Sequence, residues 1–494
     1  NTTQKTIEGQ NNITLIGSII LLGLLCANFT YSQNEKEALQ YSYLNYFGTA
    51  RYMGLGGAMG AYGKDMSAIS SNPAGQGGYN WNEFSISGDV TGTGITTIYN
   101  GSENDYLKAN YNTPNWGLVF AGTPNIGKIS NWRKFQFGYT RTRTNDFVGR
   151  TVIKGNHTNS ILNSYVNNIQ GLSLNELPSD YERLAYDAYL LDYDSIAGEY
   201  YAYTQSNDID QHKTINTSGY QYSNDVTVSG NYKNKLYVGV SLGFPSSKFN
   251  QESTYTEIHN GDTTYDLEKF TFKEELNTIG SGFNSKIGII YVPIKNVRLG
   301  LAIHSGTYYS MTDKYQNFIS SDFTDDSYDT NLETEEGEYN YSIVTPARYI
   351  GSIAFMIKKR VYLSAEYEYV DYRNAKLRSD DYKYKSENDK ISEIYKGASI
   401  VKTGAEFRVT NNWTARAGYT YYGSPFKSGS EEVDNSRTIL ASGFGFKNRK
   451  YSVDFAYTRA MSKESNFLYD PALTSAAEIE KNLNNFVISA AFRF

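Results

Sequence analysis

The feature that most constrains this chain is a series of segments, from about residue 80 to the end, in which apolar and polar residues alternate. Because successive side chains of a β-strand point to opposite sides, alternation predicts strands with one apolar and one polar face. Aromatic residues gather toward the ends of these segments, which is typical of strands in membrane barrels. The clearest segments are 236–244, 297–303, 361–369, 413–421 and 451–458.

The lengths of the connections favour the same architecture. Short and long connections alternate along the chain, and six short and seven long ones join 14 strands. We therefore predict an all-β, transmembrane antiparallel barrel with short periplasmic turns and long extracellular loops. A water-soluble sandwich or solenoid is the alternative. The expected short turns are 233–234, 293–296, 358–360, 410–412, 447–450 and a looser one at 122–132; the long segments are 99–114, 148–223, 246–279, 312–344, 373–398, 424–436 and 462–484.

Composition excludes two other classes of protein. Mean hydropathy is −0.53, and beyond the N-terminus no apolar run reaches the roughly 20 residues of a spanning helix, which excludes a polytopic helical membrane protein. A barrel stays compatible, because its alternating strands average to a polar composition. The net charge of −6 argues against a nucleic-acid partner.

The N-terminus predicts export. The apolar stretch 13–27 is short for a spanning helix and fits a signal peptide ending at Ser32. A lipoprotein anchored at Cys26 and a buried core helix are the alternatives. Since Cys26 is the only cysteine, the mature chain would hold no disulfide, and a closed barrel would supply the missing constraint. The expected organisation is 1–32 signal peptide, 33–80 plug and 81–494 barrel.

The C-terminal segment also alternates and ends the chain on an aromatic residue. Because an open sheet in lipid would leave unpaired strand edges, we expect this last strand to pair with the first. A terminal Phe on such a strand also resembles the assembly signal of outer-membrane proteins. The residues on its apolar face are Phe486, Ile488, Ala490, Phe492 and Phe494.

Charged residues on the polar faces of the strands should point into the lumen. Placing them in lipid would cost about 2–4 kcal/mol for a basic residue at the bilayer midplane. We expect them to pair with one another and fill the barrel, and a specific ligand role is the alternative. They are Lys286, Arg298, His304, Arg348, Glu366, Glu368, Lys402, Glu406, Arg408, Arg416 and Asp454.

The segment before the first strand is rich in glycine and does not alternate. Its glycines Gly54, Gly56, Gly57 and Gly60 resemble the spacing of a nucleotide-binding loop, but no strand–helix pair with a later acidic partner surrounds them. Glycine lets backbone pack closely in a confined space. We therefore predict a compact plug inside the barrel.

Within this segment, GTARYMGLGGAMGAYGKDMSAISSNPAG resembles the N-terminal signature of the FadL/TodX family of outer-membrane channels. In that family a Gly-rich hatch ends in Asn-Pro-Ala before the first strand; here the motif is Asn72-Pro73-Ala74. The likeness covers mainly residues 47–88. It implies a 14-stranded barrel in the outer membrane of a Gram-negative bacterium. It also implies passive, plug-gated uptake of long-chain fatty acids or other hydrophobic small molecules, with lateral release through a strand kink into the membrane lipid.

The longest outer segment, 148–223, carries two amphipathic stripes. A capping box, Ser179-x-x-Glu182, predicts the start of a helix for one of them. The stripes either bury against each other and the barrel rim or form part of a groove that captures a hydrophobic ligand by apolar burial. One stripe is Tyr181, Leu184, Ala188 and Leu191, and the other is Ile161, Leu162, Tyr165, Val166 and Ile169.

The sequence predicts no catalytic site, cofactor or metal. The four histidines lie far apart, no Ser/His/Asp constellation is recognisable, and the acidic loop 322–338 lacks the spacing of a calcium-binding EF-hand. Two functions stay open. One is transport of a hydrophobic small molecule. The other is a structural role in an outer-membrane machine, such as type IX secretion or barrel assembly, with tyrosine-rich loops contacting other outer-membrane proteins.

Overall fold

The structure is a computed structural model, and it describes residues 35–45, 47–123, 131–178, 180–203, 208–260, 267–428 and 435–494. The expected signal peptide, 1–32, lies outside the described residues. Within them, no helix is both long and apolar enough to cross a bilayer.

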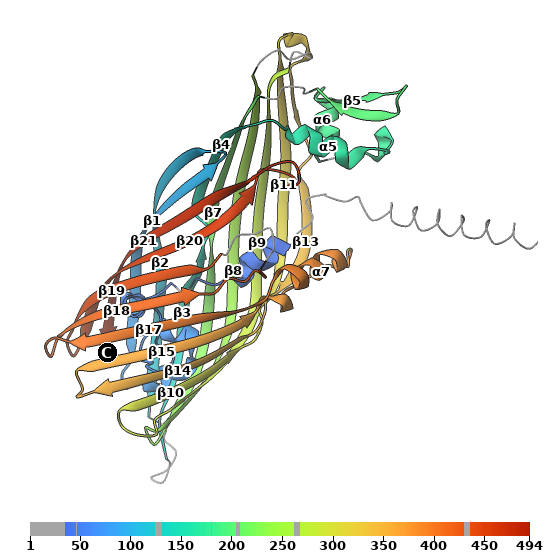
Figure 1. Ribbon diagram of the computed structural model, residues 1–494. Coiled ribbons are helices and arrows are strands. Elements are labelled where there is room, and N and C mark those ends of the chain that lie inside the picture. Colours follow the sequence, from blue (N-terminus) through green and yellow to red (C-terminus); the bar gives the residue numbers. More distant parts are fainter. Residues whose placement is uncertain are drawn as a thin grey trace, which may run out of the picture.

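Fourteen antiparallel crossings form one closed barrel (Figure 1), which confirms the predicted fold class. Three crossings are divided by a short break. In chain order they are β1 (Glu83–Tyr99), β2 (Ser102–Gly122), β3 and β4 (Trp132–Asp146 and Gly149–His157), β7 (Ile209–Tyr232), β8 (Leu236–His259), β9 (Leu267–Tyr291), β10 and β11 (Val297–His304 and Tyr308–Phe323), β13 and β14 (Gly337–Val344 and Arg348–Ile357), β15 (Val361–Asp371), β17 (Gly397–Arg408), β18 (Trp413–Tyr422), β19 (Arg437–Lys447), β20 (Tyr451–Phe467) and β21 (Ala476–Arg493).

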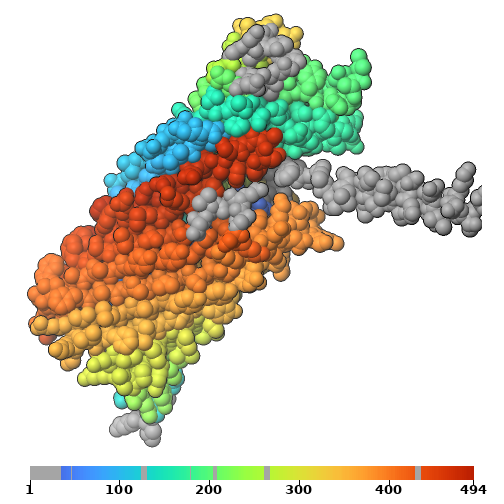
Figure 2. Space-filling view, in the orientation of Figure 1, coloured from blue at the N-terminus to red at the C-terminus, as the bar shows by residue number. Residues whose placement is uncertain are grey.

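The last strand closes the barrel against the first. β21 pairs with β1 in continuous register from Glu83 opposite Arg493 to Ile98 opposite Glu478. In Figure 2 this seam lies where the blue β1–β2 hairpin meets the dark red β21. The pairing leaves neither terminal strand with an open edge, as a barrel in lipid requires.

The alternation in the sequence decides which side chains face outward. In β8, Val240, Leu242 and Phe244 are exposed on the outer surface, whereas Gly239 and Ser241 face the interior and are buried. The other strands of the lower barrel follow the same pattern, so the outer wall carries a continuous apolar band. Its members include Ile287, Ile289, Leu301, Ile303, Phe355, Leu363, Phe407, Leu440, Phe444, Phe455, Phe486, Ile488 and Phe492.

Five of the short turns fall where the sequence predicts them, and most of the sixth, at 122–132, lies outside the described residues. Lys233 and Asn234 both have positive φ, as do Lys358 and Lys359. This conformation suits a tight hairpin turn, because its twist matches that of the flanking strands.

The outer connections differ from the prediction. Asn100 and Gly101, both at positive φ, make a tight turn between β1 and β2, so the expected long loop over 99–114 is wrong. β8 and β9 likewise continue through most of 246–279, and β11 and β13 through much of 312–344. The reason is physical: above the bilayer no lipid selects an apolar face, so the strand persists although its alternation fades.

These strands stand well clear of the bilayer. β8 has 24 residues, which at about 3.3 Å per residue is roughly 80 Å of strand. A tilted strand crosses a bilayer in about 10 residues. More than half of β8 therefore lies outside the hydrocarbon layer.

A helical layer packs on the inner face of the tall strands (Figure 1). Its buried apolar residues form one cluster with Phe270 and Phe272 of β9 and Ile319 of β11. A second group lies lower, around α7. The elements of the upper layer are α5 (Ile161–Ile169), η2 (Leu174–Glu176), α6 (Glu182–Asp187), β5 (Leu191–Asp194) and β6 (Glu199–Ala202); the remaining short elements are η3 (Asp326–Tyr328), β12 (Thr330–Glu333), η4 (Tyr372–Asn374), β16 (Lys376–Arg378) and α7 (Lys385–Ile394).

The N-terminal segment lies inside the barrel, where the fold class predicts a plug. Most of its residues from Phe47 to Tyr79 are buried, although it contains only short helices. We call residues 47–80 the plug. Its elements are α3 (Ala50–Gly54), α4 (Ala68–Ser71) and η1 (Pro73–Gly78), and α2 (Glu35–Ser42) precedes it beside α7.

Candidate functional site

The plug touches the barrel wall backbone to backbone, and its glycines make this possible. A Cβ at Gly60 would lie 2.5 Å from Glu366 Oε2, and one at Gly56 would lie 2.9 Å from Tyr419 N. Gly56 and Gly57 also have positive φ, which side chains rarely adopt. Gly54 lies against Gly443 of β19. A side chain at Gly56 or Gly60 would thus clash with the wall and one at Gly57 would crowd Tyr52 of the plug, whereas Gly54 is in ordinary contact with the wall.

The wall contributes glycines of its own, which the sequence analysis did not single out. Gly239, Gly288, Gly404 and Gly418 all face the plug, and a Cβ on any of them would come within 2.6 Å of plug atoms. The available signal was glycine at inward positions of several strands, for example Gly239 and Gly418. Plug and wall are therefore shaped to each other.

The Asn-Pro-Ala motif packs against this glycine-lined part of the wall. The Asn72 side chain accepts a hydrogen bond from the Ala74 N–H (3.0 Å) and so caps η1. Its amide also donates to the carbonyls of Ile289 (3.3 Å) and Leu301 (3.4 Å) on β9 and β10. Asn72 is 1% exposed. The motif therefore fixes the turn of the plug and anchors it to two strands at once.

Most of the predicted lumen charges form buried ion pairs. Arg348 contacts Glu368 at 2.6 Å, and Lys402 bridges Glu368 (3.1 Å) and Glu366 (2.8 Å). Arg416 contacts Glu406 (2.8 Å) and Asp454 (2.7 Å). Lys286 pairs with Asp225 at 2.9 Å. The charges thus fill the barrel by pairing with one another.

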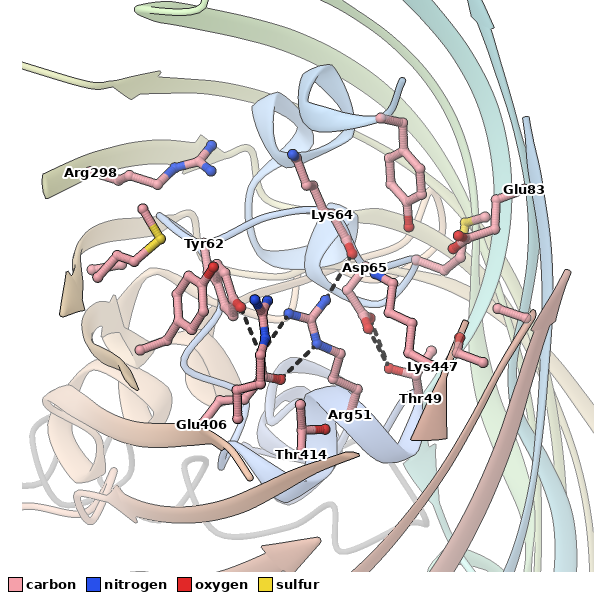
Figure 3. A pocket seen from close by; sticks show the side chains of 18 of the residues that line it. Thr49, Arg51, Tyr62, Lys64, Asp65, Glu83, Arg298, Glu406, Thr414 and Lys447 are labelled. Carbon is pink, nitrogen blue, oxygen red and sulfur yellow. Dashed lines mark hydrogen bonds and ion pairs between the residues drawn. The ribbon is translucent and has the colours of Figure 1, made fainter. Parts of the chain in front are cut away.

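The same charges hold the plug. Glu366 accepts the Gly60 N–H at 2.8 Å, and Arg348 donates to the Ser42 carbonyl just before the plug. Glu406 binds both Arg51 (3.1 Å) and the Tyr62 hydroxyl (2.8 Å), as Figure 3 shows. Movement of the plug would therefore break charge-assisted hydrogen bonds, which are among the stronger polar contacts in proteins.

Three predicted lumen charges, His304, Arg408 and Arg298, form no ion pair with a carboxylate among the described residues. His304 contacts the plug instead, with its Nε2 3.0 Å from the Ser71 carbonyl oxygen. Among these three, Arg298 is held by an aromatic ring. Its guanidinium lies over the ring of Tyr237 at 5.2 Å, and its Nε is buried without a hydrogen-bond acceptor. No ion pair joins it to a carboxylate among the residues that the structure describes. It faces a cavity below the plug together with Lys64 (Figure 3).

The barrel wall is interrupted between its second and third crossings. β2 pairs with β3 from Gly122 opposite Phe135 up to Asn115 opposite Thr142, and there the ladder ends. Above this level β2 pairs only with β1, and β3 and then β4 pair only with β7. Among the described residues, no ladder joins β2 to β4. We call this separation the β2–β3 break.

Local irregularities on both strands cause the break. In β2, Thr113 and Pro114 lie at a register shift against β1, and proline has no N–H to donate to a ladder. In β3, the register against β7 shifts between Arg143 and Asn145. The chain then turns away at Phe147, whose N–H donates to the carbonyl of Gly219.

The segment around the start of the plug lies behind this break. The Asn45 N–H donates to the Thr144 carbonyl at 2.7 Å, and the Asn45 amide donates to the Asn145 side chain at 2.8 Å. Arg143 is buried, contacts Asp89 at 2.8 Å and lies 4.3 Å over the ring of Phe47. The break is therefore closed on its inner side by residues that also contact the plug.

The proposed capture residues lie in the upper helical layer. Leu184, Ala188 and Leu191 are buried, and Tyr181 packs against the same cluster, which also takes up the stripe on α5. The two stripes thus bury against each other and the tall strands. Whether the layer opens to a ligand stays a prediction.

The helix predicted from the capping box is shorter than expected. α6 begins at Glu182 with Tyr181 as an N-cap that makes no side-chain bond, and Ser179 lies outside the described residues. α6 ends at Asp187, and Tyr189 has a left-handed φ of 58° that ends the helix. Leu191 therefore belongs to β5 rather than to the helix.

The acidic outer loop uses its charges locally. Asp325 caps η3, Asp329 accepts the Phe323 N–H, and Lys314 contacts Glu336 and Glu338. Among the described residues, no group of His, Cys, Asp and Glu is arranged to hold a metal ion.

A sequence profile of the family described as outer membrane protein transport protein (OMPP1/FadL/TodX) matches residues 201–494, more than half of the chain. The match covers the barrel from β7 onward and does not include the plug, where the sequence resemblance lies. No curated protein matches the chain.

Solved structures share the fold at low sequence identity. A Pseudomonas aeruginosa FadL homologue is 13% identical, with 92% of this chain and 100% of that chain covered and a TM-score of 0.56. The Pseudomonas putida toluene transporter TodX is 13% identical, with 92% and 100% covered and a TM-score of 0.54. The CymD monoaromatic hydrocarbon channel is 13% identical, with 91% and 98% covered and a TM-score of 0.52.

Proposed function

Because the chain belongs to the OMPP1/FadL/TodX family of outer membrane transport proteins, we propose that it takes up long-chain fatty acids or other hydrophobic small molecules. Uptake crosses the outer membrane of a Gram-negative bacterium. Passage is passive and gated by the plug, and the ligand leaves sideways through the β2–β3 break into the membrane lipid. The chain has no catalytic role in this proposal.

The filled lumen supports a route other than a straight pore. The plug, its glycine contacts and the buried ion pairs occupy the lower barrel. A hydrophobic molecule would lose apolar burial, about 25 cal/mol per Å², by crossing such a charged interior. A lateral exit lets it pass from an apolar contact to the lipid instead.

The β2–β3 break is the observation that carries the proposal. It lies at the upper edge of the apolar outer wall, since Phe120 of β2 and Phe137 of β3 are paired and exposed just below it. Side-chain contacts span the break: the Asn112 amide donates to Asp146 at 3.3 Å, and Arg150 of β4 lies 5.1 Å over the ring of Tyr106 of β2. Opening it would therefore break no backbone ladder between β2 and β3.

Two of the similar structures are described as carrying hydrophobic compounds. TodX is described as a toluene transporter and CymD as a monoaromatic hydrocarbon channel. We extend that chemistry, small apolar molecules, to this chain.

A cysteine staple tests the lateral exit. The variant Asn112→Cys/Asp146→Cys, joined through disulfide bonds by a short bis-methanethiosulfonate, should reduce uptake of a radiolabelled hydrophobic probe such as toluene or oleate into cells. Reduction of the crosslink should restore uptake. The control Phe120→Cys/Phe137→Cys staples positions that are already paired in the ladder. It should leave uptake unchanged, and equal uptake by both stapled variants would contradict lateral release.

The β5–β6 hairpin favours the second candidate, a role in contact with other outer-membrane proteins. It projects from the upper helical layer (Figure 1), and its tip residue Ile196 is 97% exposed beside Tyr193. Aromatic and apolar side chains of this kind are enriched at interfaces. Purification from native membranes followed by mass spectrometry of bound lipids and proteins separates the two functions. A stable complex with other barrels would favour this role.

A further inference from the structure

A cavity of about 690 Å³ lies at the base of the barrel, between the plug and the periplasmic turns (Figure 3). Its walls come from the plug at Thr49–Asp65, from the turns at 233–235 and 292–296, and from the ends of the last strands. We call it the basal chamber. Its size is in the range of pockets that hold small organic ligands.

The charge of the basal chamber is unbalanced. Ten lysine or arginine side chains line it, against four carboxylates. Three of the carboxylates are already held by cations: Glu406 by Arg51 and Arg416, Asp454 by Arg416, and Glu83 by Arg493. The fourth, Asp65, accepts hydrogen bonds from the Thr49 hydroxyl. The chamber therefore keeps a surplus of positive charge.

Arg298 is the most constrained of the surplus cations. It comes from β10 in the wall, and its buried Nε has no acceptor. Its side chain is partly exposed, lines the chamber, and donates to no acceptor among the described residues. A guanidinium presents a planar fork of N–H groups that fits a carboxylate or a phosphate.

Lys64 faces the same space from the plug. Its backbone has a φ of 58°, and its N–H is fixed by the Gly75 carbonyl at 3.1 Å. Within the described part of the chain, its ammonium has no carboxylate partner. Burial, together with the positive charges of Arg298 and Arg51, lowers the pKa of Lys64. Two cations on different parts of the molecule thus face each other without an anion between them.

We propose that the basal chamber binds an oxyanion, a carboxylate or phosphate group, between Arg298 of the wall and Lys64 of the plug. The bound group accepts hydrogen bonds from the terminal N–H groups of Arg298, which line the chamber, and neutralises the repulsion between the two cations. It also ties the plug to β10. Tyr237, Val292 and Ile294 line the same chamber, so the oxyanion can be free or carried by a small organic molecule.

Isothermal titration calorimetry of the full chain in detergent tests this site. The probes are inorganic phosphate and octanoate, which share the oxyanion and differ in the apolar part. Arg298→Gln and Lys64→Gln should each weaken binding at least about tenfold, because each removes a charge-assisted hydrogen bond. Two variants are used so that a folding defect in one, seen as a loss of heat-modifiable gel mobility, leaves the other to decide.

Arg449→Gln is the matched control. Arg449 lies in the turn between β19 and β20, at the same end of the barrel, and does not line the chamber. Its loss should leave affinity unchanged. Binding of both probes assigns the site to the oxyanion itself, and binding of octanoate alone assigns it to organic anions. No binding by either probe, or equal affinity in the parent, R298Q and K64Q, would overturn the proposal, as would an equal loss in R449Q. These outcomes do not depend on hydrophobic uptake.

Discussion

Replacement of Lys402 by methionine should destabilise the barrel more than the loss of any single surface ion pair. Lys402 is 1% exposed and contacts Glu366 at 2.8 Å and Glu368 at 3.1 Å, both fully buried. Methionine keeps most of the side-chain volume but removes the charge. The effect therefore reports on electrostatics rather than on packing.

The size of the destabilisation follows from the hydrogen-bond and ion-pair partners that each carboxylate keeps. Glu368 retains Arg348 at 2.6 Å, whereas Glu366 retains the Gly60 N–H at 2.8 Å and loses its cation. Removing one partner of a buried ion pair costs about 3–5 kcal/mol, because the remaining charge stays buried without compensation. We expect a loss of this size in the free energy of unfolding.

The assay is equilibrium unfolding in denaturant of protein refolded into lipid vesicles, followed by tryptophan fluorescence and gel mobility. Lys269→Met is the matched control, since Lys269 contacts Asp322 on the exposed upper wall. Its loss should cost no more than about 1 kcal/mol. The double variant Lys402→Met/Glu366→Gln should recover part of the loss, because a neutral side-chain oxygen can still accept the Gly60 N–H. The reasoning fails if K402M unfolds as easily as K269M, or if E366Q adds to the loss of K402M.

Three further predictions concern the plug, the upper layer and α2. Gly288→Ala would place a Cβ 1.9 Å from Asn72 Oδ1, so the Asn-Pro-Ala motif must shift; protease cleavage within the plug should increase, whereas Gly351→Ala, with no atom closer than 3.9 Å, should not change it. Leu162→Ala empties a fully buried position in the upper layer and should cost about 2–5 kcal/mol there, seen as faster hydrogen exchange in α5 and α6 with β18–β20 unchanged. Burial, reinforced by the nearby Asp313 carboxylate, raises the pKa of Glu37 well above its ordinary value, so docked α2 favours the protonated form. The docking of α2 should therefore weaken as pH rises from 4.5 through that raised pKa, and Glu37→Gln should abolish the dependence of α2 hydrogen exchange, corrected for its intrinsic rate, on pH; an unchanged dependence would assign it to another group.

The sequence predicts the transmembrane half of this molecule well, because lipid imposes a strict rule on it. Val240, Leu242 and Phe244 must alternate with small or polar residues, and the structure places them on the outer wall. The same rule identifies Glu366 and Lys402 as lumen residues. It does not identify their partners, since pairing across strands depends on register.

Outside the bilayer this rule no longer applies, and there the predictions fail. The hairpin at Asn100-Gly101 carried a recognisable turn signal, an Asn-Gly dipeptide, but the flanking residues do not alternate clearly enough to mark strands. Arg143 was missed for a different reason. Arg141 and Arg143 are two residues apart, so alternation places them on the same face of the strand. A register shift beside Arg143 instead leaves Arg143 fully buried and Arg141 only partly buried. A bulge cannot be placed from alternation alone.

The seam between β1 and β21 sets an order on how the molecule is put together. The plug precedes the first strand made, and its Ala50 N–H donates to the Ser489 hydroxyl on the last, beside the hydroxyl of Ser87. If β21 paired with β1 before the plug entered, the closed barrel wall would obstruct its entry. The plug must therefore already be in place when β21, the last strand of the barrel, pairs with β1.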